Sequence, residues 1–235
     1  IRAIVEDKQK NIWLGVDGGG LDFYNEATDD FTAYKHIPND PTSLTNDIMM
    51  NIEIDVDGNF WIGTYDGGLN KFNPITKKVE QFHHDPNNPN SLSHETVWSV
   101  FQNTDRTMWL ATRGGGLCIY NPVTKKFTTY SYNKNNQYGI NSDKILSILK
   151  DRSGLIWIGS ENNGINIYDE KSRKFLLNKN EIGNSNSLSN DNVMAMKQSG
   201  DVLWIATRGG SLNSMNMKTG SISKYHAASS SKYDF

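Results

Sequence analysis

"WIGTYDGGLNKFNP", residues 61–74, decides the fold, because close variants of it occur five times along the chain. "WLATRGGGLCIYNP" fills residues 109–122 and "WIGSENNGINIYDE" fills residues 157–170. Looser variants, "WLGVDGGGLDFYNE" and "WIATRGGSLNSMNM", begin at residues 13 and 204. The tryptophans that open these phrases are separated by 48, 48, 48 and 47 residues: Trp13, Trp61, Trp109, Trp157 and Trp204. A fixed period of this length is the signature of a repeat protein.

Three further features keep the same phase. Eight residues after each tryptophan comes an aliphatic residue: Leu21, Leu69, Leu117, Ile165 and Leu212. Four residues later comes an asparagine or aspartate: Asn25, Asn73, Asn121, Asp169 and Asn216. A capping phrase precedes each following unit, beginning at Ser43, Ser91, Gly139 and Ser187. The repeat therefore extends over the whole chain.

Each unit divides into four short segments with strand character. In the second unit they are "IMMNIEI", "FWIGT", "GLNKFN" and "KVEQFHH", which are aromatic, β-branched or alternating in polarity. Turn signals separate them: "DVDGN", a glycine pair expected to supply positive φ angles, and "NPITKK". Four antiparallel strands in about 48 residues predict a β-propeller blade. The large, flat tryptophans are expected to be structural anchors that pack between neighbouring blades.

The sequence thus predicts an all-β fold, a β-propeller with five four-stranded antiparallel blades. One domain is expected over residues 1–235. Its blades are expected at about residues 1–36, 46–84, 94–132, 142–177 and 190–226, with 227–235 as the start of a sixth repeat or a closing tail.

Composition limits the functional classes. The 235 residues carry a formal net charge of −2 with basic and acidic residues interspersed, so no nucleic-acid patch or polybasic anchor is expected. No apolar run approaches the roughly 20 residues of a membrane span, so any membrane attachment is expected outside this chain. A single cysteine, Cys118, excludes an internal disulfide. The chain opens on Ile1 inside an expected strand, which favours excision from a longer protein.

The repeated phrases resemble the two-component regulator propeller repeat over all five units, best in those that begin at Asn46 and His94. The resemblance implies the extracytoplasmic, periplasmic sensor half of a hybrid histidine kinase, which binds an oligosaccharide and relays the signal to a kinase outside this chain. It also implies self-association through the parent sensor, no cofactor and no catalysis by this segment. Such repeats commonly form seven-bladed propellers, so the five units are expected to be part of a larger array. A closed five-bladed ring, with Phe235 beside the first blade, is the alternative.

Candidate ligand-binding residues lie where the second strand of each unit turns into the third. The interblade connections are expected at the same end, and they carry His36, Asn39, His84, Asn87, Tyr132 and Asn135. Within the repeated frame, the residue four after each tryptophan changes from unit to unit. Arginine and aromatic residues there would suit a carboxylated or sulfated sugar, whereas solvated turn residues are the simpler interpretation. The candidates are Asp17, Tyr65, Asp66, Arg113, Glu161, Asn162 and Arg208.

Other chemistries have weaker support. Asp55, Asp57 and Asn59 stand at calcium-loop offsets, but the glycine of that loop is misplaced and a hairpin turn explains them better. His83 and His84 are adjacent, so in a strand they point to opposite faces and no metal site is expected. Asp17, Asp66 and Glu161 could serve a propeller glycoside hydrolase or lyase, although the innermost strands look apolar or neutral. A protein-interaction scaffold is a further alternative.

Overall fold

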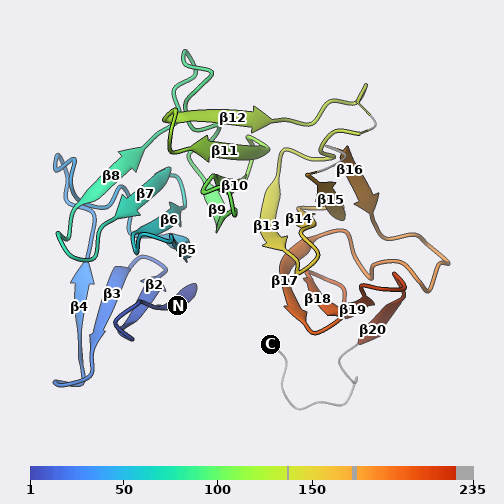
Figure 1. The fold of residues 1–235 in the computed structure, drawn as a ribbon, viewed down its shortest axis with the longest axis horizontal. Coiled ribbons are helices and arrows are strands. Elements are labelled where there is room, and N and C mark those ends of the chain that lie inside the picture. Colours follow the sequence, from blue (N-terminus) through green and yellow to red (C-terminus); the bar gives the residue numbers. More distant parts are fainter. Residues whose placement is uncertain (137, 171–173, 226–235) are drawn as a thin grey trace. The chain divides into compact units, whose positions relative to one another are not determined.

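The computed structural model describes residues 1–136, 138–170 and 174–225, and all regular structure in these ranges is β-strand (Figure 1). Twenty strands form five four-stranded sheets, in each of which strands consecutive in the chain pair antiparallel. This confirms the all-β fold of five four-stranded antiparallel blades. The expected sixth-repeat start at residues 227–235 lies outside the described residues, as do residue 226 of the fifth blade and residues 171–173 of the fourth.

The chain divides into two compact units, Ile1–Ser131 and Tyr132–Phe235. Unit 1 holds blades 1 to 3. Blade 1 comprises β1 (Ala3–Glu6), β2 (Ile12–Val16), β3 (Gly20–Asn25) and β4 (Asp30–Tyr34). Blade 2 comprises β5 (Met49–Ile54), β6 (Phe60–Thr64), β7 (Leu69–Phe72) and β8 (Val79–Phe82). Blade 3 comprises β9 (Val97–Gln102), β10 (Met108–Thr112), β11 (Leu117–Asn121) and β12 (Lys126–Tyr130).

Unit 2 holds blades 4 and 5. Blade 4 comprises β13 (Ile145–Lys150), β14 (Ile156–Ser160), β15 (Ile165–Asp169) and β16 (Lys174–Asn178). Blade 5 comprises β17 (Val193–Ser199), β18 (Val202–Thr207), β19 (Leu212–Asn216) and β20 (Ile222–Tyr225). Within each unit the first strands of successive blades contact one another, β1 with β5, β5 with β9, and β13 with β17, and are therefore the inner strands. That all blades form one domain stays a prediction.

The repeated tryptophans pack between blades where a following blade covers them within the same unit. Trp13 of blade 1 meets Phe60 and Phe72 of blade 2, with ring centroids 5.0 and 5.7 Å apart. Trp61 of blade 2 meets Tyr120 of blade 3 at 5.5 Å. Trp157 of blade 4 shares a core with Leu203, Ile205 and Met215 of blade 5. These contacts place Trp13, Trp61 and Trp157 between neighbouring blades, where the sequence expected the anchors.

An aspartate six residues before the tryptophan holds three of the indole rings. The indole N–H donates to a carboxylate oxygen at 2.9, 2.9 and 2.7 Å in the pairs Trp13–Asp7, Trp61–Asp55 and Trp157–Asp151. In blade 2 the other oxygen of Asp55 accepts the backbone N–H groups of Asp57 and Asn59. The "DVDGN" segment is therefore a hairpin turn that also orients the indole, as the sequence favoured over a calcium loop.

A close backbone approach explains the glycine of "WIGT". An added Cβ on Gly63 would lie 2.5 Å from the carbonyl oxygen of Val97, on the inner strand of blade 3. On Gly159 it would lie 2.7 Å from a methyl group of Val193 of blade 5. Both distances are shorter than van der Waals contact, so a residue without a side chain lets the next blade pack closely.

Candidate functional site

The turn between the second and third strands of a blade touches the connection that leads to the next blade. Backbone N–H groups of the turn glycines donate to carbonyl oxygens of the connection: Gly20 to Asp47, Gly68 to Glu95 and Gly164 to Asp191, at 2.9, 2.6 and 2.8 Å. Turns and connections therefore share one end of the blades, as the sequence predicted. This end is called the turn end below.

A hydroxyl group closes each of the turns in blades 2 to 5. The side chains of Thr64, Thr112, Ser160 and Thr207 donate to the carbonyl oxygen four residues later, at 2.7–2.8 Å. Positive φ angles occur at the fifth residue after the tryptophan in all five blades and at the seventh in blades 1 to 4, for example at Asp66 (61°) and Gly68 (77°), and not at Gly67. The expectation that both glycines of the pair take positive φ was therefore wrong, because the left-handed positions flank the first of them.

This geometry gives two candidate residues a backbone role. Asp66 and Asn162 both occupy the fifth position, with φ angles of 61° and 68°. Aspartate and asparagine tolerate this left-handed conformation better than other residues with a side chain. Their residue types are thus explained by the turn, whatever else their exposed side chains contact.

At the fourth position the backbone is constant and the side chain varies. The N–H groups of Tyr65, Arg113, Glu161 and Arg208 donate to the carbonyl oxygens of Ile48, Thr96, Lys144 and Asn192, at 2.9–3.1 Å. The four residues make equivalent backbone contacts, but their side chains are an aromatic ring, a carboxylate and two guanidinium groups. The turn therefore constrains the backbone at this position and leaves the side chain free to vary.

Four of the seven candidates form a row in unit 1. Asp17 pairs with Ile48 in a β-bridge, and Tyr65 donates to the same residue. The backbone N–H of Asp66 donates to the Thr96 hydroxyl at 3.3 Å, and Arg113 donates to the Thr96 carbonyl oxygen at 3.1 Å. Ile48 and Thr96 thus link the turn residues of blades 1, 2 and 3.

The other three candidates form a cluster in unit 2. The Asn192 side-chain amide donates to Asn162 Oδ1 at 3.4 Å, and the backbone of Arg208 donates to the Asn192 carbonyl oxygen. Glu161 is only 13% exposed at its side chain and lies 3.8 Å from Lys144 Nζ. Each unit therefore carries its own set.

The side chains in the row of unit 1 differ in their partners. Asp17 accepts two hydrogen bonds from the Arg2 guanidinium, at 2.8 and 3.1 Å, which neutralises its charge. The Arg113 guanidinium lies 5.2 Å from the centroid of the Trp98 ring, a cation–π contact. The Tyr65 side chain is exposed. The blade 2 and blade 3 end of the row is thus the part rich in aromatic groups.

The six candidates on the connections between blades make hydrogen bonds or adopt backbone angles within those connections. The rings of His36 and His84 contact the carbonyl oxygens of Leu44 and Leu92 through Nδ1, each at 2.7 Å. Asn39 has a positive φ of 66°. The backbone N–H groups of the remaining three donate to carboxylate or amide oxygens: Asn87 to Asp85, Tyr132 to Asp143 and Asn135 to Asn133. These contacts give His36, His84 and Asn39 a structural explanation, whereas in the other three they involve only the backbone.

Two residues were missed from the sequence. Trp98 is the sixth tryptophan, out of phase with the five anchors, and its being surplus to the repeat is the signal that could have identified it. The inner strands are also not uniformly neutral, since β5 carries Glu53. Burial raises the pKa of this carboxyl, although it accepts the Gln102 backbone N–H at 3.2 Å.

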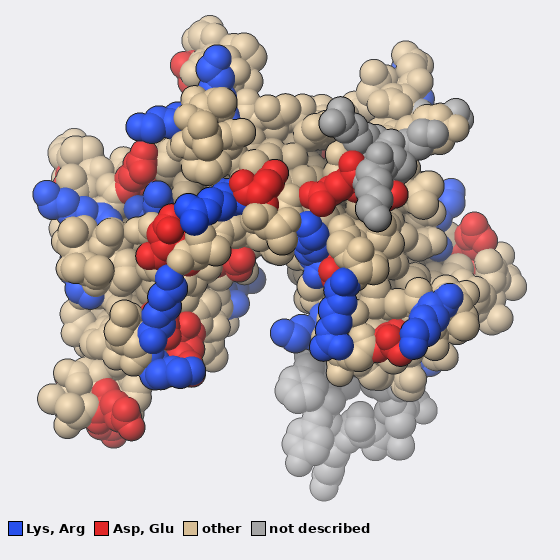
Figure 2. Space-filling view, viewed as in Figure 1, with Lys and Arg blue, Asp and Glu red and all other residues tan. Residues whose placement is uncertain are grey.

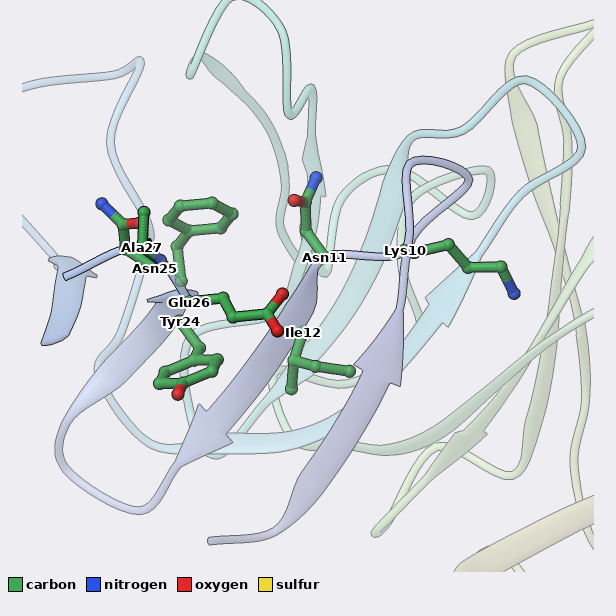
Figure 3. A pocket seen from close by; sticks show the side chains of 8 residues that line it. Lys10, Asn11, Ile12, Tyr24, Asn25, Glu26 and Ala27 are labelled. Carbon is green, nitrogen blue, oxygen red and sulfur yellow. Dashed lines mark hydrogen bonds between the residues drawn. The ribbon is translucent and has the colours of Figure 1, made fainter. Parts of the chain in front are cut away.

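A cavity of about 570 Å³ lies on blade 1, away from the turn end (Figure 3). Its residues Ile12 and Tyr24 correspond to Phe60 and Phe72 of blade 2, against which Trp13 packs. The cavity is thus an uncovered blade-packing face. None of the seven candidates lines it; its residues are Lys10, Asn11, Ile12, Phe23, Tyr24, Asn25, Glu26 and Ala27.

Charge is mixed on the face of the molecule that Figure 2 shows. Blue and red side chains alternate on the face shown in Figure 2. Within residues 1–136, 138–170 and 174–225, no group of three or more His, Cys, Asp or Glu is placed to hold a metal ion. The same ranges contain no helix long and apolar enough to cross a membrane.

Comparison with known proteins identifies the repeat. Residues 139–162 match the family model of the two component regulator propeller, which confirms the resemblance over the end of the connection into blade 4 and over its strands β13 and β14. No curated protein sequence matches the chain.

Solved structures share the fold at low identity. The extracellular domain of a protein assigned as a hybrid two component system, from B. thetaiotaomicron, superposes with a TM-score of 0.77 at 23% identity, covering 96% of this chain and 28% of that one. PorZ, a surface component of the type-IX secretion system of Porphyromonas gingivalis, gives 0.67 at 17%, covering 91% and 31%. Virginiamycin B lyase from Staphylococcus aureus gives 0.66 at 16%, covering 95% and 69%.

These likenesses establish the fold and nothing more specific. This chain spans about a third or less of the first two proteins. The three proteins also have different functions on one fold, so function must be argued from the site.

Proposed function

We propose that this chain is an extracytoplasmic, ligand-sensing propeller segment of a hybrid two-component sensor. In this proposal it lies in the periplasm, binds an oligosaccharide at the turn end and passes the signal to a histidine kinase elsewhere in the parent protein. The regulator propeller repeat at residues 139–162 supports this assignment, as does the likeness to the extracellular domain of a hybrid two component system.

The observation that carries the proposal is the fourth turn position. Four equivalent backbone contacts, from Tyr65, Arg113, Glu161 and Arg208, hold four turns in one geometry. The side chains at this position differ in charge, size and aromaticity, and those of Tyr65 and Arg208 are exposed. A constant frame with variable tips is an arrangement suited to ligand recognition, because specificity can change there without a cost to folding.

The test is calorimetric titration of the chain with neutral, uronate-bearing and sulfated oligosaccharides, followed by product analysis of each mixture. Binding of one class with no change in the sugar is the expected result. Turnover of the sugar would instead favour a hydrolase or lyase, with Asp17, Asp66 and Glu161 as the carboxylates to substitute first. Absence of binding across the panel would contradict the proposal.

A specific observation favours a second candidate, a self-association scaffold. The uncovered face of blade 1 is apolar, with Ile4 and Phe31 exposed beside Ile12 and Tyr24. The matching face of blade 2 receives a tryptophan from its neighbour, so the fitting partner is a further blade of the same repeat. Sedimentation equilibrium of the chain and of Tyr24→Asp tests it, and a monomer at all concentrations would exclude it.

A further inference from the structure

We propose that unit 2 carries a second ligand site at the end opposite the turn end, which binds an apolar ring bearing a carboxylate group. The site is a cavity of about 350 Å³ between blades 4 and 5, lined by the apolar side chains of Leu155, Trp157 and Met217 and by the exposed Arg152. Because consecutive strands pair antiparallel, the β13–β14 and β17–β18 turns lie at the opposite end of their blades from the β14–β15 turn. The cavity is therefore separate from the oligosaccharide site of the proposed function.

The first argument concerns the side chains that bridge neighbouring turns at this end of the blades. Between blades 1 and 2, the Lys8 ammonium group donates to the carbonyl oxygen of Val56. Between blades 2 and 3, the Arg106 guanidinium lies 3.8 Å from the Asp57 carboxylate. Arg152 stands three repeats after Lys8, and its guanidinium has no hydrogen-bond or ion-pair partner among the residues that the structure describes. The cation at this position of unit 2 is thus available to a ligand.

The second argument is that a shorter turn leaves the junction of blades 4 and 5 open. In blade 2, five residues separate the paired Ile54 and Phe60, whereas in blade 5 four residues separate the equivalent pair, Gln198 and Leu203. This missing residue is the reason that the last interval between tryptophans is 47 residues. A shorter turn reaches less far over the neighbouring blade, and the cavity lies beside it.

The third argument is that the polar groups inside the cavity are already paired. The Asp151 carboxylate accepts the Trp157 indole N–H at 2.7 Å through one oxygen and the Leu155 backbone N–H at 2.9 Å through the other. The Gln198 amide accepts the Arg152 backbone N–H at 3.1 Å and donates to a carbonyl oxygen of its own turn. The hydroxyl groups of a sugar would therefore face apolar side chains without partners, which is unfavourable. The cavity favours a ligand with an apolar body.

The fourth argument is the charge of the lining residues. Lys218 and Asp201 pair at 2.6 Å, so their charges offset each other. The negative charge of Asp151 opposes an anionic ligand, but this carboxylate is buried and stabilised by four hydrogen bonds. The Arg152 guanidinium presents a planar fork of N–H groups, which binds a carboxylate through two parallel hydrogen bonds. A flat apolar ring in the cavity, with its carboxylate toward Arg152, satisfies both the apolar surface and the exposed cation.

The experiment uses the full 235-residue chain, with hydrocinnamate and its uncharged amide as probes in titrations followed by ligand-detected NMR. The acid is expected to bind with a Kd of about 1 mM or lower, as a ligand of this size can, and more tightly than the amide. Arg152→Gln should weaken binding of the acid by about threefold to tenfold, because an exposed charged hydrogen bond is lost, and leave the amide unaffected. Met217→Trp should abolish binding of both probes, because the larger side chain fills the cavity.

Lys8→Gln is the matched control, since it removes the cation from the equivalent position of blade 1 and should leave binding unchanged. Equal binding of acid and amide, no binding of the acid, or normal binding by Arg152→Gln or Met217→Trp would overturn the proposal. A loss in Lys8→Gln as large as that in Arg152→Gln would mean general charge attraction and would also overturn it. Circular dichroism of each variant verifies that the fold is intact. None of these residues lies at the turn end, so each result leaves the proposed function to its own test.

Discussion

Blade 2 and blade 5 have nearly the same central phrase but different surroundings. In β6 of blade 2 all five residues are buried, whereas burial alternates along β18 of blade 5. Trp61 is 2% exposed and meets Tyr120 of the next blade at 5.5 Å. Trp204 is half-buried, and its described ring contact is with Tyr225 of its own blade, also at 5.5 Å.

The difference shows where the stability of the repeat arises. A four-stranded sheet with two apolar faces buries one face when it stacks on a single neighbouring blade. It buries both faces when it lies between two blades. The anchor tryptophan is present in both blades, but the area it removes from water depends on the neighbouring blade. The same substitution should therefore have different effects in the two blades.

The largest expected difference is at the anchors themselves. Trp61→Ala should lower the free energy of unfolding by about 3–5 kcal/mol, because it removes a fully packed ring and leaves a cavity between two blades. Trp204→Ala should cost about half as much, since part of that ring is already in water. Urea denaturation of both variants measures this. Equal losses would mean that the anchors stabilise their own blades and not the stack.

The central-strand glycine gives the next effect. Gly63→Ala places a Cβ 2.5 Å from the Val97 carbonyl oxygen, so blades 2 and 3 must separate, at a cost of about 1–3 kcal/mol. The equivalent residue of blade 5 is Ala206, where a Cβ is already present. Ala206→Gly is the matched control and should cost less than about 1 kcal/mol. A neutral Gly63→Ala in urea denaturation would contradict the close approach of the blades.

The carboxylate below the tryptophan is the third point of comparison. Asp55 accepts the Trp61 indole N–H at 2.9 Å together with two backbone N–H groups. In strand register the equivalent residue of blade 5 is Ser199, which is exposed and carries no carboxylate. Asp55→Ala should cost about 1–3 kcal/mol, because buried donors lose their acceptor, and Ser199→Ala should cost less. A difference in the opposite direction in thermal unfolding would show that the indole hydrogen bond is unimportant.

How much of this the sequence could predict depends on whether a feature repeats. The turn residues, the tryptophans and the 48-residue period specify the blade, because each represents a local conformation or a packing position that recurs. The "DVDGN" segment was correctly interpreted as a hairpin turn for the same reason, but the hydrogen bond from the Trp61 indole to Asp55 was not predicted. The turn end was located correctly because connection and turn must meet when four strands pair in order.

Features that occur once could not be obtained in this way. Ile12 and Phe60 occupy equivalent positions in blades 1 and 2, and both are apolar. The residue types therefore do not show that this face is covered in blade 2 and open in blade 1. Trp98 contacts Arg113 only because residue 98 begins an inner strand at the turn end, a register that the repeat pattern leaves unassigned. The prediction that both glycines of the pair take a positive φ was wrong because one of the two left-handed residues of the turn is Asp66.

The smallest expected effect concerns Glu53 on the inner strand of blade 2. Its equivalent in blade 5 is the exposed Lys197, whereas burial raises the pKa of the Glu53 carboxyl above its ordinary value of about 4.5. The folded chain therefore binds this proton more tightly than the unfolded chain, and stability falls as the pH rises from about 4.5 through the raised pKa. Glu53→Gln should remove this fall and give a slightly higher melting temperature at pH 7 with little change at pH 4, while Lys197→Gln should change neither. If Glu53→Gln instead melts lower at pH 7, the ionised carboxylate stabilises the contact with the Gln102 backbone, and the buried charge in the covered blade is a favourable one.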